Sequence, residues 1–288
     1  MAAEPTRIVD AHVHLWDPAR TDWYPYLSRP PEDGAGDASR MYRQFGVDSY
    51  QAETGRWNVE KFVNVAAATG RHSIEETIEL DRTAQDQGGP DAIVGGLPPT
   101  DTVAEAVDLL DRQMSAPRFR GVRPMGIHGG PVPSTDVLHA LGERNLLFEL
   151  MAHPDQLRGA AAELAGIDGL VVVVEHTGWP RSNSDEERAL WRTGIDALAG
   201  LGDNVVCKLS GLAMPFGSMQ VDVLAPWIEY AIETFGVDRC LFASNFPVDA
   251  MCGTFDELYT TFSDVAAGLD SESREKLFAG NAERVYRC

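Results

Sequence analysis

Short β-branched or apolar runs alternate with longer amphipathic segments along most of this 288-residue chain. After a first strand expected near residues 8–17, seven further runs lie at 62–69, 91–99, 119–126, 146–154, 169–180, 204–214 and 239–249. Helical spacing of apolar residues follows the runs, as at 74–80, 103–110 and 223–232. Eight strand and helix units in a chain of this length predict one α/β domain over residues 1–288. They favour a closed (β/α)8 TIM barrel over an open doubly wound sheet.

The net charge of -20 makes nucleic acid and anionic membranes poor partners, because phosphate binding needs a concentrated basic surface. No stretch approaches the ~20 apolar residues of a membrane span, and residues 1–6 lack a signal-peptide pattern, so we expect a cytoplasmic protein. The four cysteines show no C-x-x-C spacing, and no G-x-G-x-x-G motif opens a helix. Zinc knuckles, disulfides and dinucleotide binding therefore have no support. A homo-oligomer is compatible with the sequence.

A long segment at about residues 17–60 separates the first expected strand from the second. It contains Trp23-Tyr24-Pro25-Tyr26, three further prolines and several glycines, and it shows no clear periodicity. A connection of this length is typical of a functional lid or a disordered insertion, and its aromatic residues favour the lid. We therefore expect the part from Trp23 to Tyr50 to cover the mouth of the barrel.

Two histidines stand two residues apart where the first apolar run ends, in Asp10-Ala11-His12-Val13-His14. Because strand side chains alternate between faces, Asp10, His12 and His14 are expected on one face. Two imidazoles so placed can bind a metal ion or contact a substrate oxyanion. Polar residues at a strand end that are satisfied by hydrogen bonds explain the pattern equally well.

In a (β/α)8 barrel the carboxyl ends of the strands meet at one face, where functional side chains gather. The polar residues expected there are His12, His14, Arg123, His153, His176, Lys208, Ser244 and Asn245, with Arg71, His128, Arg181 and Asp249 in the loops beyond. His153 and Lys208 are equally compatible with ordinary strand-end roles. His176 follows the apolar run 170–174, where a buried ionisable group is costly unless it is used or paired. Its neighbour Glu175 is expected on the opposite face.

Six ordered motifs carry a family resemblance: DAHVHLWDP (10–18), FRGVR (119–123), EHTGWP (175–180), KLSGL (208–212), SNFPVD (244–249) and GNAERVY (280–286). With them the chain resembles the amidohydrolase superfamily, in particular its lactonase-like branch of fuconolactonases and 2-pyrone-4,6-dicarboxylate lactonases. The motifs run from the first strand to the last helix, so the resemblance covers nearly the whole chain. It implies a distorted (β/α)8 barrel with its active site at the carboxyl ends of the strands.

The resemblance also implies roles for single residues. The family's histidine ligands of a divalent ion such as zinc, if one is bound, correspond to His12, His14, His153 and His176. The strand-eight aspartate that activates water in better-understood relatives is replaced by Asn245, and an amide cannot take a proton. Asp249, four residues further on, either replaces this base or caps the next helix. Loss of the carboxylate makes metal-free catalysis, which is known in this branch, as acceptable as a metal site.

These observations predict hydrolysis of a small anionic or sugar-acid lactone by activated water. The expected catalytic residues are His12, His14, His176, Asn245 and Asp249. The expected substrate-binding residues are Arg123, His153, Lys208, Arg71, Arg181 and Trp16. The alternatives are a decarboxylase or hydratase of the same superfamily, against which Asn245 counts, and a catalytically silent binding protein.

Arg123 is the residue expected to bind a substrate carboxylate. It shares its strand parity with Phe119 and Gly121, so it faces the barrel interior if they do. A guanidinium there suits an anionic ligand. The structural alternative is an ion pair with Glu149 on the neighbouring strand, although Glu149 is expected to lie deeper.

Overall fold

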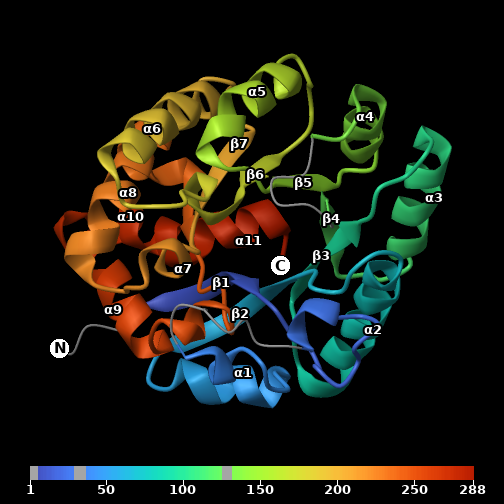
Figure 1. Ribbon diagram of the computed structural model, residues 1–288, viewed down its shortest axis with the longest axis horizontal. Coiled ribbons are helices and arrows are strands. Elements are labelled where there is room, and N and C mark those ends of the chain that lie inside the picture. The colour runs from blue at the N-terminus through green and yellow to red at the C-terminus, as the bar shows by residue number, and fades with distance from the viewer. Residues whose placement is uncertain (1–5, 29–36, 125–131) are drawn as a thin grey trace.

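The computed structural model describes residues 6–28, 37–124 and 132–288. Its eight parallel strands stand side by side in the order β1 to β8 (Figure 1). They cover, in that order, Arg7–Val13, Asn58–Val65, Ala92–Leu97, Phe119–Pro124, Leu147–Leu150, Val172–Val174, Val205–Leu209 and Cys240–Phe242. The end of β8 returns to β1 through hydrogen bonds from Asn245 N to His12 O and from His14 N to Phe246 O, each 2.8 Å. The predicted (β/α)8 barrel is confirmed.

Helices surround the strand ring (Figure 1). Helices α1 to α11 cover, in order, Val47–Thr54, His72–Gln87, Val103–Gln113, Thr135–Glu143, Pro154–Leu164, Asp185–Ala199, Ala213–Phe216, Val221–Phe235, Phe255–Val265, Ser271–Glu275 and Asn281–Tyr286. Parallel neighbouring strands require such a return path, since each strand must start again at the same end of the barrel. Within the described residues, no helix has both the length and the apolar character needed to cross a membrane.

Apolar side chains pack on both faces of the strand ring. The larger cluster fills the space between strands and helices and includes Phe148 and Trp227. A second cluster lies inside the ring and consists mainly of small and β-branched residues from the strands, together with Val285 and Tyr286 of α11. Arg7, at the start of β1, pairs with α11, so this helix closes the amino-terminal end of the barrel. The interior is therefore apolar at that end, which leaves the carboxyl ends of the strands for polar groups.

A bulge in β1 reverses the side-chain alternation that the sequence suggests. The three steps from residue 10 to residue 13 pair with only two steps along β2. His12 and His14 therefore face inward, whereas Asp10 lies outside the strand ring. There Asp10 accepts hydrogen bonds from Tyr50 Oη and from Ser244 N, each 2.8 Å. The expectation that Asp10 shares a face with the two histidines is wrong.

A second bulge lies in β4. Two successive residues of β3 pair with Phe119 and Gly121, so Arg120 is the extra residue on β4. Phe119 packs in the outer cluster, while Arg123 reaches the barrel interior. The expected common face is therefore wrong for Phe119, but the inward direction of Arg123 is confirmed.

The connection between β1 and β2 packs against the neighbouring β2 end and α2. Its described parts contain two 3₁₀ turns and α1, and β2 begins at Asn58, slightly before the expected end of the insertion. Tyr26 Oη donates to Ala67 O at 2.8 Å, and Tyr24 Oη donates to Glu76 Oε1 at 3.0 Å. Residues 29–36 of the expected lid lie outside the described residues. Coverage of the barrel mouth by this segment stays a prediction.

The outward position of Asp10 leads to a first prediction. Tyr50→Phe should lower the free energy of unfolding by about 1–3 kcal/mol, because one oxygen of a buried carboxylate loses its donor. The partly exposed Tyr42 provides the matched control, and Tyr42→Phe should have little effect. Urea unfolding measures both variants. Turnover should not change with Tyr50→Phe, and a loss of activity at unchanged stability would instead place Asp10 in the site.

Candidate active site

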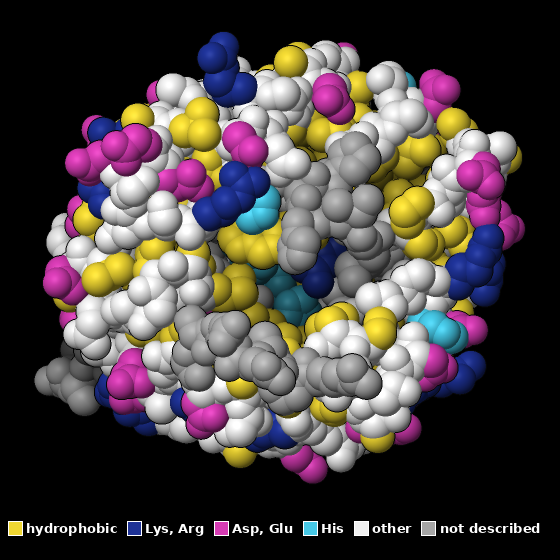
Figure 2. Space-filling view, viewed as in Figure 1, with side chains coloured by type: hydrophobic (Ala, Val, Ile, Leu, Met, Phe, Trp, Pro, Cys, Tyr) yellow, Lys and Arg dark blue, Asp and Glu magenta, His cyan; other side chains and the backbone are white. Residues whose placement is uncertain are grey.

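Seven ionisable side chains meet inside the carboxyl end of the barrel, on or just after five strands. They are His12, His14, Arg123, Glu149, Glu175, His176 and Lys208, and none is more than 8% exposed. Figure 2 shows a hollow at the centre of the molecule, with histidine and basic side chains at its floor. Buried ionisable groups are costly unless they are paired or used, so this cluster is the candidate active site.

His12 and His14 form a hydrogen-bonded pair. Their Nε2 atoms lie 3.1 Å apart, and His14 Nδ1 lies 2.7 Å from the carbonyl oxygen of Val65. Because a carbonyl only accepts, His14 Nδ1 carries the hydrogen. Burial lowers the pKa of His14 to about 3 and the pKa of His12 well below its ordinary value, so both rings are neutral. His14 Nε2 is then an acceptor, and the hydrogen between the two rings belongs to His12 Nε2.

Lys208 contacts the other nitrogen of His12. Its Nζ lies 3.3 Å from His12 Nδ1 and 2.8 Å from each carboxyl oxygen of Glu149. An ammonium group only donates, so His12 Nδ1 accepts, which agrees with a hydrogen on Nε2. Tyr286 Oη donates to Glu149 Oε1 at 2.5 Å. Lys208 is fully buried, so the structure places it in an ion pair inside the barrel and not at the open mouth.

The chain leaves β6 in a 3₁₀ turn, Glu175–Gly178, in which His176 and Thr177 have positive φ angles of 50° and 55°. This backbone ends the strand alternation, and Glu175 and His176 are both buried on the inner side. Glu175 Oε2 lies 3.3 Å from Arg123 Nη1 and 3.9 Å from His176 Nε2. The expectation that Glu175 and His176 point to opposite faces is wrong.

His176 keeps one ring nitrogen outside the hydrogen bonds made by the described residues. Its Nδ1 lies 3.0 Å from Ser210 Oγ, whereas Nε2 lies 3.9 Å from Glu175 Oε2, which is beyond hydrogen-bond distance. Gly211, with a φ of 66°, passes so close that a Cβ there would lie 2.4 Å from His176 Nδ1. Burial lowers the pKa of His176 to about 4. The neutral ring can therefore donate to a ligand or accept from one through Nε2.

Arg123 pairs with Glu175 and retains an unused donor. Its Nη2 donates to the carbonyl oxygen of Ala66, while Nε is buried with no hydrogen-bond partner in the described part of the chain. Burial raises the pKa of Glu175, but the charge of Arg123 opposes this and helps to hold the pKa below its ordinary range. The expected alternative partner of Arg123, Glu149, pairs with Lys208 instead.

Asn245 and Asp249 form a hydrogen-bonded pair after β8. Asn245 has a φ of 57°, and its Nδ2 donates to Asp249 Oδ1 at 2.9 Å. Asp249 Oδ2 is buried and has no partner among the residues that the structure describes. Burial raises the pKa of Asp249 to about 8, against the hydrogen bond from Asn245. The N-cap of the following helix, α9, is Thr254, so the alternative role of Asp249 as its cap is wrong.

Trp16 and His153 lie one aromatic ring away from the histidine cluster. Trp16 stacks on His14 with ring centroids 5.7 Å apart. His153 stacks on Trp179 at 4.5 Å, and the Trp179 ring lies 5.8 Å from that of His176. Both predicted residues therefore lie beside the cluster, separated from its centre by no more than one ring.

The remaining predicted residues do not join the cluster. Arg71 is exposed and pairs with Glu105, and Arg181 is exposed and pairs with Asp155 at 2.9 Å. His128 lies outside the described residues. These residues were expected in the site because they follow strands in the sequence. In a loop, such a position does not fix the direction of a side chain.

Sequence reasoning missed Ser210 and Tyr286, and it treated Glu149 only as a structural partner. Glu149 could have been found, because it lies two residues after the apolar Leu147 on the same strand face. Tyr286 could not have been found in this way, because its contact with Glu149 joins residues 137 positions apart in the sequence.

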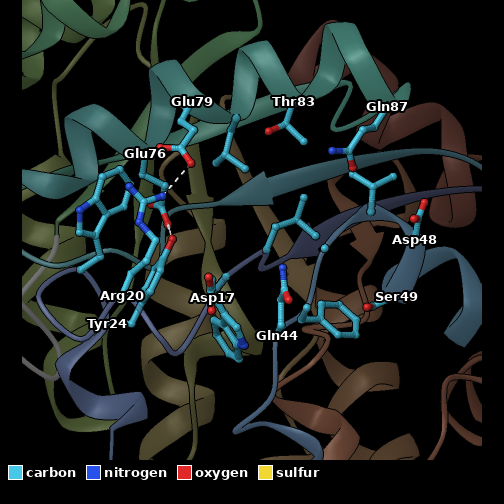
Figure 3. Close-up of a pocket in the computed structure, with 17 residues that line it drawn as sticks. Asp17, Arg20, Tyr24, Gln44, Asp48, Ser49, Glu76, Glu79, Thr83 and Gln87 are labelled. Atoms are coloured by element: carbon cyan, nitrogen blue, oxygen red, sulfur yellow. Dashed lines mark hydrogen bonds and ion pairs between the residues drawn. The ribbon is translucent and has the colours of Figure 1, made fainter.

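A separate cavity of about 460 Å³ lies outside the barrel, between the first connection, α1 and α2 (Figure 3). Two of its acidic residues are already paired, since Arg20 Nη1 donates to Glu79 at 2.7 Å and Tyr24 Oη donates to Glu76. None of the seven ionisable residues described above lines this cavity. We therefore place the chemistry in the barrel.

Atoms that could bind a metal ion are present in the cluster. However, one of them carries a hydrogen and another is already paired with a lysine. The 3.1 Å between the Nε2 atoms of His12 and His14 suits two ligands at 2.0–2.1 Å from one ion. His12, Glu149 and Glu175 also bring ligand atoms within 4.8 Å of one another. However, His12 Nε2 carries a hydrogen, and Lys208 already pairs with Glu149. As arranged, these residues do not fit a divalent ion.

Known proteins match nearly the whole chain. The family model described as Amidohydrolase matches residues 9–288. Among curated proteins, an L-fucono-1,5-lactonase of Burkholderia ambifaria is 28% identical, over 97% of this chain and 95% of that protein.

Two solved structures share the fold. An amidohydrolase from Burkholderia multivorans with bound zinc has a TM-score of 0.81 at 24% identity, over 97% of this chain and 99% of that one. A probable 2-pyrone-4,6-dicarboxylic acid hydrolase from Acinetobacter baumannii with citric acid bound has a TM-score of 0.71 at 16% identity, over 98% and 99%. Because the family model matches residues 9–288, this chain belongs to the amidohydrolase family and is a hydrolase built on a (β/α)8 barrel.

Proposed function

We propose that this enzyme hydrolyses a small lactone that carries a carboxylate or derives from a sugar acid. The observation that carries the proposal is a pair of buried polar atoms without hydrogen-bond partners in the described chain, namely Arg123 Nε and Asp249 Oδ2. Arg123 lies at the end of β4, in the cluster that contains the neutral imidazoles, and Asp249 begins the 3₁₀ turn Asp249–Met251 after β8. Buried polar groups are normally satisfied, so such atoms beside a hollow mark where a ligand or water binds.

The relatives support this substrate class. One is named for a lactone, and one structural neighbour is named for a dicarboxylic acid and holds citric acid. We transfer only two features from these names, a cyclic ester and a carboxylate.

In our proposal, Asp249 is the general base. Asn245 holds its Oδ1, which leaves Oδ2 to take a proton from water. The water oxygen then bonds to the lactone carbonyl carbon, and the ring C–O bond breaks. The proton on Asp249 passes to the ring oxygen that leaves, so the product is an open-chain hydroxy acid and Asp249 is restored. A pKa of about 8 makes this carboxylate a stronger base than an exposed one.

His176 stabilises the oxyanion that forms during the attack. If Ser210 donates to His176 Nδ1, then Nε2 carries a hydrogen and can donate to the negative oxygen. The His12 ring lies beside it, with centroids 4.6 Å apart. His12 and His14 extend the neutral, polar wall of the site, and no step of the proposal requires a metal ion.

Arg123 binds the substrate carboxylate through Nε, which has no hydrogen-bond partner among the described residues. Lys208 is excluded from this role because Glu149 holds it inside the barrel. Arg71 and Arg181 are excluded because they lie exposed, in ion pairs of their own. The sequence suggested four cations for this role. Among them Arg123 has an unused donor in the described part of the chain.

Replacing Arg123 with lysine tests the recognition of the carboxylate. Arg123→Lys keeps a positive charge beside Glu175 but removes the planar fork. We expect kcat/KM for a carboxylated lactone to fall about 10–100-fold, which corresponds to one charged hydrogen bond. A neutral lactone of the same ring is the matched control and should react at nearly the original rate. Equal losses on both substrates, together with a lower melting temperature, would show that Arg123 serves the fold.

The role of Asp249 predicts a pH profile. Below its pKa of about 8 the base is protonated, so kcat/KM should rise about tenfold per pH unit up to that value and then level off. Asp249→Asn should lower kcat about 10²–10⁴-fold. A flat profile between pH 5 and 9 would contradict the assignment.

Stability provides the control for Asp249→Asn. The folded-state pKa of Asp249 lies above the unfolded value of about 3.9, so its neutral form favours folding. Its contribution is full below that value and is lost as the pH rises through about 8. The asparagine variant has no carboxyl group at this position, so its stability does not fall for this reason as the pH rises. At pH 9 its free energy of unfolding should equal or exceed that of the original protein, although activity has fallen.

A further inference from the structure

We infer that the ammonium group of Lys208 is the resident cation of this site and keeps a divalent metal ion off His12 and His14. The inference concerns metal affinity, so it stands or falls independently of the proposed lactone substrate. It rests on the contacts of Lys208 and on the hydrogen positions of the two histidines.

Lys208 Nζ occupies a position that suits a cation. Its three short contacts are the two carboxyl oxygens of Glu149, at 2.8 Å, and His12 Nδ1, at 3.3 Å. His12 and Glu149, together with Glu175, form the group whose ligand atoms lie within 4.8 Å of one another. Lys208 is fully buried, and its partner Glu149 is fixed by Tyr286 at 2.5 Å. The ammonium therefore contacts donor atoms that a metal ion would need.

The two histidines differ in how they are prepared for a metal. Histidine ligands usually donate their other ring N–H to a carbonyl, a carboxylate or water. His14 follows this rule, because its Nδ1 donates to Val65 O and its Nε2 is free of hydrogen. His12 does not follow it, because its Nδ1 faces the donor Lys208 and its Nε2 carries the hydrogen. Only one nitrogen of the facing pair offers a lone pair.

Metal binding at this pair would require a rearrangement in the barrel interior. The hydrogen of His12 would have to move to Nδ1, where it would face the N–H groups of Lys208, and two buried donors would then oppose each other. The ion would also lie close to the positive charges of Lys208 and Arg123. Removal of Lys208 relieves both problems, since His12 Nδ1 is then free to carry the hydrogen and Glu149 becomes available as a ligand.

The test measures zinc affinity directly. Protein freed of metal with a chelator is titrated with Zn²⁺ in competition with a chromophoric chelator. Lys208→Met should bind one ion about 10–100-fold more tightly than the original protein, the range by which groups around metal ligands alter affinity. Lys276→Met is the matched control, because Lys276 also lies between two acids, Asp238 and Glu272 at 2.9 Å each, but at the surface. It should gain no affinity.

Two further variants make the result decisive. Adding His12→Asn to Lys208→Met should abolish the gain, which places the ion on the histidine. Lys208→Met/Glu149→Gln removes both charges together, and it should gain zinc at the histidine pair even if Lys208→Met folds only when zinc is present. Zinc binding by the original protein as tight as by Lys208→Met, and lost with His12→Asn, would overturn the inference. So would a folded Lys208→Met that gains no zinc.

Discussion

The ion pair between Lys208 and Glu149 inside the barrel is the interaction on which the arrangement of the site depends. Removing one partner of such a buried pair costs about 3–5 kcal/mol, because the other is left without compensation. The pair continues to Tyr286 on one side and to His12 on the other. One network therefore joins the last helix, the fifth and seventh strands and the first strand. The hydrogen on His12 Nε2 agrees with this network, because Lys208 donates to His12 Nδ1, while the acceptor on His14 is set by the Val65 carbonyl.

Departures from regular strand geometry decide which side chains enter the barrel. The bulge in β1 turns His12 and His14 inward and leaves Asp10 outside, where its hydrogen bonds to Ser244 N and Tyr50 stabilise the irregular strand. The left-handed residues after β6 bring Glu175 inward beside its neighbour. Both departures increase the number of ionisable groups at the strand ends. Irregular backbone at a functional site commonly serves this purpose, since it aims side chains that regular strands would turn away.

The charge of the site differs from the charge of the protein. The chain carries a net charge of -20, yet the buried cluster contains two carboxyl groups and two cations, Lys208 and Arg123. Surface charges are screened within about 8–10 Å at ordinary ionic strength, whereas buried groups interact at short range in a low dielectric. A substrate anion therefore meets the local guanidinium donor and the neutral imidazoles, and the acidic surface matters less.

The sequence by itself determined the barrel, the strand-end position of the histidines and the position of Arg123 at the end of its strand. The spacing of apolar residues distinguishes strands from helices, and the same strand and helix pattern recurs eight times along the chain. Only the tertiary structure decided that Asp10 lies outside, that Glu175 lies inside, and that Lys208 pairs with Glu149 while Arg123 pairs with Glu175. The physical reason is that a bulge or a left-handed residue shifts the alternation by one position without a strong local signal. Ion pairs across the barrel, moreover, join residues far apart in the chain, and a local sequence pattern does not show which of these residues come into contact.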